Sequence, residues 1–329
     1  MGLKADADAI RKVLAARTQT LQLGPRQWWL DYAFHFTDVQ NAVGILTEEK
    51  LLSRGEAVAR SLMKVENADR EIIHRSAHRT ANFARLYFRP RTPTQWNNEG
   101  CRPEGHRPRN AHCPVPIFFL FDLATVLIQE GVLFSNGQAA SPSVVLGGGA
   151  AALRNMNWKD IYSSGSMGTD PSRIGDLKFY RMAEILVPDE LGLDALSHVV
   201  CRTGPERTTL LSLLSPEARA KWRSKIRLNG RAELYEGHWT YVQDVTWTAD
   251  TVVIMFNPSW EPAPFKVRAT ITNPSDNRSF EYATDRSFQA GNNRLRLKIP
   301  VAMETAHVTV WLDRCLVYDA ELQCQDLLL

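Results

Sequence analysis

The stretch NFARLYFRPRTPTQWNNEG, from Asn82 to Gly100, is the most informative part of this 329-residue chain. Its apolar and aromatic core, Leu86 to Phe88, predicts a strand that runs directly into basic residues spaced by prolines. A polar loop from Thr92 to Gly100 follows, with amides, a tryptophan and a glycine. A purely structural strand would end in a short turn, so this long run of donors and acceptors indicates a binding site.

Two further segments carry polar residues in apolar surroundings. YAFHFTDVQNAVGILTEEKLLS (Tyr32 to Ser53) predicts a short strand over 32–36 and a helix over 39–47, for which Asp38 is a natural N-cap. YRMAEILVP (Tyr180 to Pro188) places Glu184 in an otherwise apolar strand. A solvent-facing carboxylate and a site carboxylate look the same in this pattern, and the residues alone favour the solvent-facing one.

Taken together and in this order, the segments resemble the DarT family of nucleic-acid ADP-ribosyltransferase toxins. Four motifs carry the resemblance: H-x-T at His35 and Thr37 followed by N-x-x-x-I-L, Y-F-x-P at Tyr87 to Pro90, F-S-N-G at Phe134 to Gly137, and R-x-A-E-x-L-V at Arg181 to Val187. All of them lie between residues 30 and 200, so the remainder of the chain is outside the resemblance.

The resemblance implies a catalytic carboxylate and arginine. Breaking the nicotinamide–ribose bond of NAD develops an oxocarbenium-like cation, which a nearby carboxylate stabilises. The family's catalytic glutamate matches Glu184, which would also hold a ribose hydroxyl. The family's arginine on the preceding helical segment matches Arg75, with Arg79 as the alternative.

The resemblance also implies an NAD site, with NAD as the ADP-ribose donor. Its contacts would be His35, Thr37, Asn41 and Tyr87. The residues alone leave other interpretations open, because a histidine flanked by Phe34 and Phe36 is more often a core residue and Tyr87 is as readily core as site.

The Asn82–Gly100 stretch also suggests contacts to nucleic acid. Arginines are dense from Arg85 to Arg109, and the functional interpretation is phosphate contact beside a ring on which a base stacks. The residues expected to make these contacts are Arg89, Arg91, Gln95 and Trp96. The alternative is an ordinary solvated basic surface.

One position departs from the family. Many members carry F-x-D-G-H, whereas this chain reads Phe134-Ser135-Asn136-Gly137-Gln138. Glutamine donates and accepts hydrogen bonds but is neither acid nor base at neutral pH. The base that is modified therefore stays open: thymidine chemistry, guanine and an RNA base are all compatible with this sequence.

Composition indicates a globular protein. Hydrophobic residues make up 44% of the chain, and the net charge of +3 allows a local basic patch but not a grip on nucleic acid by the whole surface. Five scattered cysteines without a secretory leader suggest reduced thiols in the cytoplasm, and no stretch is apolar enough for a membrane span. Cys101, His106, His112 and Cys113 lack the paired spacing of zinc knuckles, so we predict no metal site.

The sequence predicts an α+β protein with four parts. These are an N-terminal helical extension over 1–27, an ADP-ribosyltransferase-like mixed sheet with helices over 28–204, a helical connector over 205–224 and a β-sandwich-like domain over 225–329. The last part follows from short Val-, Thr- and aromatic-rich runs separated by turn signals. We expect the transferase part to work without it.

The hypothesis from sequence is a mono-ADP-ribosyltransferase that modifies a base in single-stranded nucleic acid, with DNA favoured. It would be the toxin of a toxin–antitoxin or phage-defence system. Its partners would be the nucleic acid and a cognate antitoxin, either a macrodomain ADP-ribosyl hydrolase or a chaperone-linked protein. The alternatives are an RNA-modifying enzyme with the same site, transfer to protein or water, and an inactive binding module.

Overall fold

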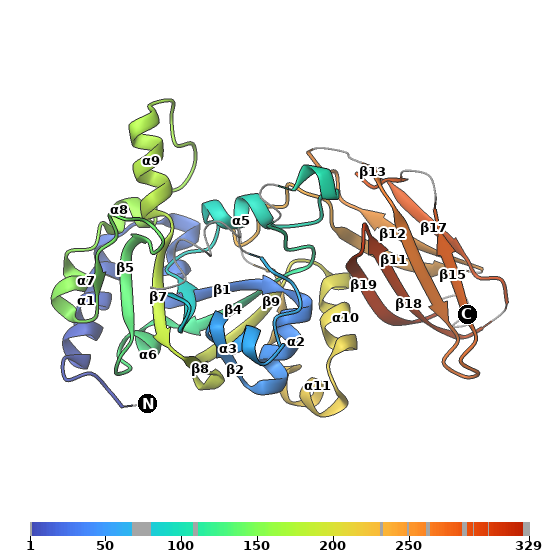
Figure 1. The fold of residues 1–329 in the computed structure, drawn as a ribbon, viewed down its shortest axis with the longest axis horizontal. Helices are drawn as coiled ribbons and strands as arrows, with labels where there is room; N and C mark the ends of the chain where they lie inside the picture. Colours follow the sequence, from blue (N-terminus) through green and yellow to red (C-terminus); the bar gives the residue numbers. More distant parts are fainter. Residues whose placement is uncertain are drawn as a thin grey trace.

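The structure is a computed structural model, and it describes residues 2–67, 80–107, 111–230, 233–248, 250–260, 264–284, 288–291, 293–301 and 303–324. A mixed sheet with helices forms one side of the molecule and a β-rich part forms the other (Figure 1). The N-terminus lies in the first part and the C-terminus in the second. None of the described helices is long and apolar enough to cross a membrane.

The first part is built on an eight-stranded sheet with the order β10-β9-β4-β1-β3-β7-β5-β6. Its pairs are antiparallel except β9 with β10. Strand β4 is apolar and buried along nearly its whole length, as expected for a central strand. The strands are β1 (Tyr32–Asp38), β3 (Phe83–Tyr87), β4 (Pro116–Asp122), β5 (Leu133–Gln138), β6 (Leu146–Gly147), β7 (Ala183–Pro188), β9 (Leu196–Cys201) and β10 (Ile226–Leu228).

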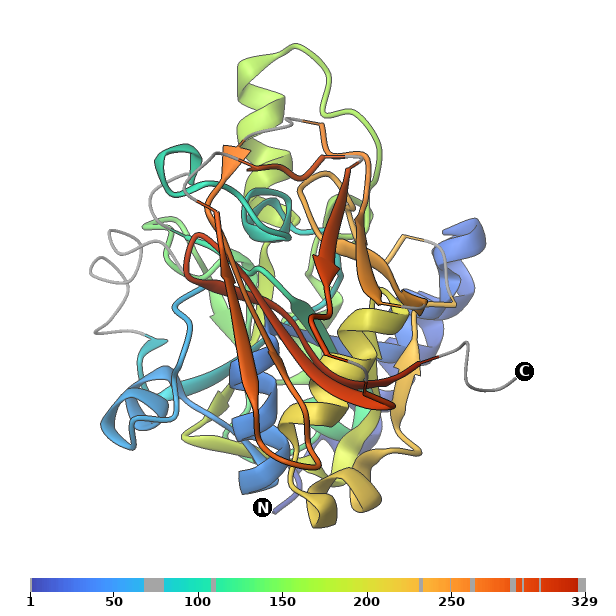
Figure 2. The same ribbon diagram turned by 90° about the vertical axis from the view of Figure 1, so that its right-hand side faces the viewer.

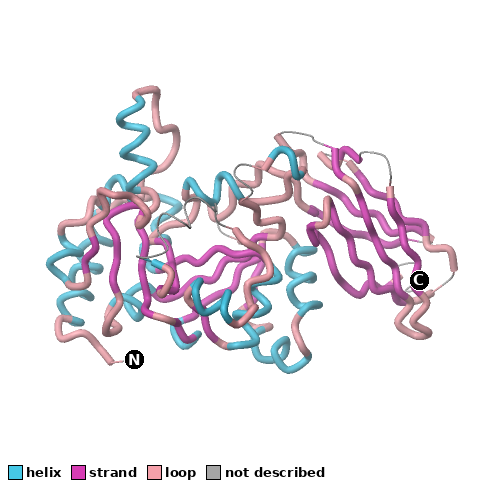
Figure 3. Tube along the Cα trace, in the orientation of Figure 1, coloured by secondary structure: helices cyan, strands magenta, loops and turns pink. Residues whose placement is uncertain are grey.

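Helices and short elements surround this sheet (Figure 3). The Asp38 carboxylate accepts a hydrogen bond from the Gln40 amide at 3.0 Å, which confirms the predicted cap of α2. The α-helices are α1 (Ala7–Thr20), α2 (Val39–Glu48), α3 (Arg54–Ala59), α5 (Pro93–Asn98), α6 (Leu123–Leu127), α7 (Ala150–Arg154), α8 (Trp158–Ile161), α9 (Pro171–Tyr180), α10 (Gly204–Leu213) and α11 (Pro216–Trp222). The short elements are η1 (Gly24–Asp31), η2 (Glu104–His106), η4 (Leu193–Ala195) and the paired strands β2 (Lys50–Leu52) and β8 (Glu190–Gly192).

The second part consists of antiparallel sheets, which fill the front of the view in Figure 2. Inward residues alternate along β18, and side chains such as Trp247, Phe256 and Ile271 form a core separate from that of the first part. The predicted α+β class with further sheets at the C-terminal end is confirmed. The sheets are β11 (Val242–Thr248), β12 (Thr251–Phe256) and β17 (Arg294–Lys298); β14 (Val267–Thr272), β15 (Ser279–Ala283), β18 (Thr305–Leu312) and β19 (Cys315–Gln323); and β13 (Pro264–Phe265) with β16 (Phe288–Gln289).

The first core continues beyond residue 225. Strand β10 pairs in parallel with β9, and Leu234 and Tyr235 are buried in the first core. The Tyr235 hydroxyl donates to the carbonyl oxygen of Val200 at 2.5 Å. Helix α10 also contacts the second part, because the Thr209 hydroxyl accepts from the Asp319 amide at 3.1 Å. The predicted domain boundary at residue 225 stays a prediction that the two parts fold independently. A comparison of two truncated chains tests it.

We predict that a chain ending at residue 224 is less stable than one ending at residue 241. Both lack the second core, but only the shorter chain loses β10, Leu234 and Tyr235 from the first. Loss of these buried side chains should lower the free energy of unfolding by at least about 3 kcal/mol. Urea unfolding of the two truncated chains measures the difference, and equal midpoints would support a boundary at 225.

Candidate active site

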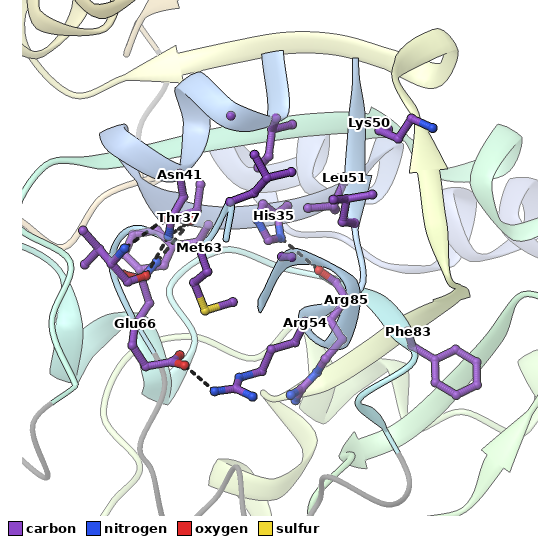
Figure 4. Close-up of a pocket in the computed structure, with 18 of the residues that line it drawn as sticks. His35, Thr37, Asn41, Lys50, Leu51, Arg54, Met63, Glu66, Phe83 and Arg85 are labelled. Atoms are coloured by element: carbon purple, nitrogen blue, oxygen red, sulfur yellow. Dashed lines mark hydrogen bonds and ion pairs between the residues drawn. The ribbon is translucent and has the colours of Figure 1, made fainter. Parts of the chain in front are cut away.

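A cavity of about 200 Å³ lies where β1, α2 and β3 meet (Figure 4). His35, Thr37 and Asn41 line it together with Arg85 and Tyr87. The described structure therefore brings together all four residues predicted to contact NAD, although they come from separate motifs. Other lining residues are Lys50, Arg54, Met63, Glu66, Phe83 and Thr94.

Glu184 lies on β7 directly behind this cavity and is fully buried. Its Oε2 atom accepts from the guanidinium of Arg85 at 2.5 Å, and its Oε1 accepts from the Ala139 amide at 3.1 Å. Tyr87 is its partner across the β3–β7 ladder. The solvent-facing interpretation of Glu184 is thus wrong, because burial of its carboxylate is compensated by an ion pair and a backbone donor.

The F-S-N-G motif holds this glutamate from the neighbouring strand β5. The Ser135 hydroxyl accepts from the Glu184 amide at 2.9 Å and donates to the Gly137 carbonyl oxygen at 2.6 Å. Glycine is needed at 137, since a Cβ there would come within 2.3 Å of the Phe179 ring. Two motifs that are far apart in sequence therefore form one support for the carboxylate.

Arg85 connects the buried glutamate to the cavity, and the sequence analysis did not assign it to the site. Its side chain is 28% exposed and lies beside Arg54 at the same side of the cavity (Figure 4). Burial lowers the pKa of Arg85, but the charge of Glu184 and the hydrogen bond to it outweigh burial and raise it overall. The alternation of β3 could have indicated this role, because Arg85 lies two residues before Tyr87 and faces the same side.

His35 is held as a neutral ring with one defined tautomer. Burial lowers its pKa to about 4, and its Nδ1 lies 3.0 Å from the carbonyl oxygen of Arg85. A carbonyl oxygen only accepts, so Nδ1 carries the proton and Nε2 is an acceptor. His35 can therefore accept a hydrogen bond from a bound ligand at neutral pH.

Asn41 and Thr37 build the wall of the cavity. The Asn41 amide donates to the Thr37 hydroxyl at 3.2 Å and to the Val65 carbonyl oxygen at 2.7 Å. Its carbonyl oxygen accepts from the amides of Lys64 at 2.8 Å and Val65 at 3.1 Å. Both donors and both acceptor positions of Asn41 are thus occupied, so it positions the 64–65 segment along the cavity.

Tyr87 lies between the cavity and Glu184. Burial and the negative charge of Glu184 raise the pKa of its phenol to about 12. It therefore stays protonated at neutral pH and presents a flat ring and a hydroxyl to the cavity. This arrangement fits either a packing surface or a hydrogen-bond donor for a bound ring.

A second cleft of about 680 Å³ contains three of the four predicted nucleic-acid contacts, Arg89, Arg91 and Trp96. Lys178 and Arg181 add positive charge to its lining, and Glu233 and Glu236 add negative charge. Helix α5 borders both spaces, because Thr94 and Asn98 line the cavity and Pro93, Trp96 and Asn97 line the cleft.

Arg89 and Gln95 are buried, and their predicted contact with nucleic acid stays a prediction. The Arg89 guanidinium donates to the carbonyl oxygens of Pro90, Ile161 and Ser163, and burial lowers its pKa to about 9. The Gln95 amide accepts from the Arg91 amide at 2.6 Å and donates to Glu99 at 2.7 Å. Both side chains position the loop, because their hydrogen-bonding groups are used inside the protein.

Trp96 and Arg91 are accessible. The Trp96 ring is 41% exposed and lies 4.1 Å from His238 and 5.6 Å from Trp260, centroid to centroid. His238 lies only 3.7 Å from Trp260, whose ring is 62% exposed. Arg91 is 29% exposed and pairs with Glu236 at 2.7 Å. The sequence analysis missed His238 and Trp260, since they follow the resemblance and an isolated exposed tryptophan carries no motif.

Arg75 and its alternative Arg79 lie outside the described residues. Of the four cysteines and histidines for which no metal site was predicted, Cys101 and His112 do come together, and they meet Cys315 of β19 with their ligand atoms within 4.8 Å of one another. His106 and Cys113 are not in this cluster. By side-chain type, Cys101, His112 and Cys315 could hold a metal ion. The spacing of cysteines and histidines along the sequence could not reveal this cluster, because Cys315 lies about two hundred positions after the other two residues.

We predict that substitution of His35 by glutamine changes the pH dependence of stability. The folded-state pKa of about 4 lies below the ordinary value of 6.5, so the stabilising effect of neutral His35 is complete above pH 6.5 and is lost as pH falls toward 4. The free energy of unfolding of the wild type relative to His35→Gln should fall on the order of 2 kcal/mol over this interval, since the ring is only partly buried. Urea unfolding at several pH values measures it.

His307 provides a control of opposite sign. Its hydrogen bond to Asp319 raises its pKa, so its stabilising effect is present at low pH and is lost as pH rises. The wild type relative to His307→Gln should therefore lose stability toward high pH. A pH-independent difference for His35→Gln would mean that folding does not lower the pKa of His35.

Comparisons with known proteins show which family the chain belongs to. The family model DarT, described as ssDNA thymidine ADP-ribosyltransferase, matches residues 34–236 and so ends just after Tyr235 of the first core. DarT of Thermus sp. 2.9 in complex with ADP-ribosylated ssDNA superposes with a TM-score of 0.50 and 15% identity over 62% of this chain and 96% of that one. This likeness shows the fold.

Two weaker likenesses accompany it. The complex of the same Thermus protein with NAD+ gives a TM-score of 0.45 at 14% identity, covering 62% of this chain and 97% of that one. Thermosipho africanus DarTG in complex with ADP-ribose gives 0.43 at 22% identity, covering 55% and 46%. No curated protein matches in sequence. Because the family model spans more than half of the chain, the protein belongs to the DarT family of NAD-dependent ADP-ribosyltransferases that act on single-stranded DNA.

Proposed function

We propose that Glu184 is the carboxylate that stabilises the transition state when the nicotinamide–ribose bond of NAD breaks. The observation that carries this proposal is the burial of Glu184 behind the cavity, where Arg85 and the Ala139 amide hold it. A fixed carboxylate in a water-poor environment stabilises a developing positive charge without reorganisation. It would also accept a hydrogen bond from a ribose hydroxyl, as each oxygen retains acceptor capacity.

The other cavity residues would each contact a different part of the NAD molecule. Arg54 and Arg85 supply positive charge for the diphosphate, since arginine forks match phosphate oxygens. His35, neutral with Nε2 as acceptor, suits a ribose hydroxyl or an amide N–H. Tyr87 offers its ring to the nicotinamide. Arg75, which the resemblance assigns to catalysis, completes this proposal.

The acceptor in this proposal is a base in single-stranded DNA, with thymine as the first candidate because the family is described as acting on thymidine. A base must leave its stack to be modified, so an unpaired strand is the favourable substrate. The exposed rings of Trp96 and Trp260 with His238 between them support this, because such rings stack bases. Many members of the family have histidine where this chain has Gln138. The identity of the modified base therefore has to be tested.

We further propose that the protein is a toxin with a cognate antitoxin, because a base-modifying activity on DNA harms the cell that contains it. An ADP-ribosyl hydrolase of the macrodomain type or a chaperone-linked protein would be the partner. This part of the proposal rests on the family. Growth after induction of the chain with and without a neighbouring gene tests it separately from the chemistry.

We predict that Glu184→Gln slows transfer by about 10²–10³-fold, because the developing charge loses its counter-charge. The protein is incubated with NAD and single-stranded oligonucleotides of each base, as DNA and as RNA. Mass spectrometry then follows the addition of one ADP-ribose unit. The wild type should modify one DNA base, and thymine is expected.

Loss of the ion pair also affects stability, so the experiment needs a control. Asp160→Asn removes another largely buried carboxylate that pairs with a half-exposed arginine, Arg173 at 2.5 Å, and Asp160 does not line the cavity. It should lose stability but keep the rate. A rate for Glu184→Gln within tenfold of the wild type would refute the assignment, and modification of RNA alone would replace DNA as substrate.

We predict that Trp260→Ala and Trp96→Ala weaken binding of a single-stranded oligonucleotide but not of NAD. One stacked base contributes about 1–3 kcal/mol, equivalent to about 5- to 100-fold in affinity. Leu228→Ala removes an equally accessible apolar side chain from β10 and serves as the control. Fluorescence titrations with oligonucleotide and NAD measure the two affinities. If Trp260→Ala bound the oligonucleotide as tightly as the wild type, the surface that binds nucleic acid would lie in the first part of the molecule alone.

A further inference from the structure

A cluster of sulfur and nitrogen atoms lies where the two parts of the molecule meet, away from the proposed active site. Cys315 begins β19 in the second part, and Cys101 and His112 come from the 99–113 segment of the first. Cys101 is 1% exposed and His112 is 5% exposed, whereas Cys315 is accessible in part. The segment is anchored by the Cys101 amide, which donates to the carbonyl oxygen of Thr240 at 2.7 Å.

The tautomer of His112 follows from its neighbours. Its Nε2 lies 3.1 Å from the backbone amide of Arg102, which can only donate, so Nε2 is an acceptor without a proton. Burial lowers the pKa of His112, so the ring is neutral and its proton is on Nδ1. Nδ1 lies 3.5 Å from the Sγ of Cys315 and therefore donates to that sulfur.

Two donors converge on this one sulfur. Besides His112, the Arg107 guanidinium donates to Cys315 Sγ at 3.3 Å, and the Cys101 sulfur lies within 4.8 Å of it. Sulfur accepts several hydrogen bonds well only as the thiolate, and a cationic guanidinium favours that form. The neighbouring Cys101 thiol, the hydrogen bond from His112 and the positive charge of Arg107 lower the pKa of Cys315 to about 4, although burial acts in the opposite direction. Burial and Cys315 raise the pKa of Cys101.

The same donors argue against a metal ion. A histidine nitrogen that carries a proton has no lone pair for a metal, and moving the proton to Nε2 would set it against the Arg102 amide. The charge of Arg107 beside the sulfur opposes a cation as well. The remaining charged groups near the cluster are the carboxylates of Asp38 and Asp313 and the guanidinium of Arg102. The hydrogen bonds from His112 and Arg107 favour the thiolate of Cys315 over the thiol, which would donate to the Asp313 carbonyl oxygen at 3.8 Å.

We propose that Cys315 is a peroxide-reactive thiolate and that Cys101 is its resolving thiol. The Cys315 thiolate attacks one oxygen of hydrogen peroxide, the O–O bond breaks, and hydroxide leaves and takes up a proton to give water. The sulfenic acid on Cys315 is then attacked by the Cys101 sulfur; an S–S bond forms, and the Cys101 proton leaves with the sulfenic oxygen as a second water. Two thiols are oxidised by two electrons and one peroxide is reduced.

The disulfide would join the two parts of the molecule covalently. Residue 101 follows Gly100 and Glu99 at the end of the loop that carries α5 and Trp96. Cys315 lies at the start of the longest strand of the second part. Oxidation would therefore fix the loop with Trp96 to the sheet of the second part, where at present only non-covalent contacts act.

The pH profile of alkylation tests the thiolate in the wild-type protein. With iodoacetamide under native conditions, the rate at Cys315 should change less than about twofold between pH 5.5 and 7.5. An ordinary thiol changes by about 100-fold over two pH units below its pKa. Peptide mass spectrometry resolves the five cysteines. A profile for Cys315 that rises tenfold per unit would refute the thiolate.

Peroxide treatment tests the resolving step. One equivalent of hydrogen peroxide should yield a Cys101–Cys315 disulfide, detected in a non-reducing peptide digest. Cys101→Ser should instead leave a sulfenic acid on Cys315 that a cyclic 1,3-dione traps, and Cys315→Ser should give neither product. Cys113→Ser is the control, because Cys113 is buried outside the cluster and should leave the disulfide unchanged.

Three results would overturn the proposal. They are a disulfide that involves another cysteine, sulfinic acid on Cys315 without any disulfide, and one equivalent of zinc in the purified wild type that is absent from Cys315→Ser. The last result would make the cluster a metal site. None of these results depends on transferase activity, so the proposed function and this inference can fail independently.

Discussion

The ion pair between Arg85 and Glu184 is the interaction on which the active-site region depends. A fully buried carboxylate is costly unless it is paired and hydrogen-bonded. Three strands meet that requirement: β3 supplies the guanidinium, β5 supplies the Ser135 support and is followed directly by the Ala139 amide, and β7 carries the glutamate itself. The same arginine reaches the cavity and its carbonyl oxygen fixes the tautomer of His35. Strand pairing, the charge state of the cavity and the orientation of its histidine are therefore coupled through one residue.

A second buried carboxylate, Glu99, connects the two parts of the molecule. It accepts from the Arg202 guanidinium at 3.1 Å, the Gln95 amide at 2.7 Å and the backbone amides of Glu236 and Gly237 at 2.9 and 2.8 Å. Arg202 also pairs with Glu206 and lies 3.7 Å above the Tyr241 ring. The loop with Trp96, helix α10 and the chain that leads into the second part are thus held by one charge network. Removal of Arg202 would leave the buried carboxylates of Glu99 and Glu206 without this cationic partner, which is strongly destabilising.

Much of the site could be predicted from the sequence, because local patterns encode local structure. The cap of α2, the strand with Tyr87 and the strand with Glu184 follow from residue types and spacing, and the family resemblance ordered them correctly. What could not be predicted depends on contacts between distant segments. Gln95 and Arg89 look like surface residues, yet partners far along the chain bury them. His238, Trp260 and Cys315 complete clusters whose other members lie more than a hundred positions earlier, so no motif marks them. The roles assigned to Arg75, Glu184 and the NAD contacts stay predictions.

The aromatic group of Trp96, His238 and Trp260 has a consequence for how such enzymes can be recombined. Its rings come from both sides of the point at which the family match ends. A transferase unit cut from this chain and grafted onto another protein would keep its proposed catalytic residues but lose part of the proposed surface for the strand. If that proposal holds, a foreign C-terminal module that supplied no ring at this place would yield a hybrid with chemistry but weak capture of DNA. An exchange of C-terminal modules would then be functional only if the incoming module restored the rings that now lie beyond residue 236.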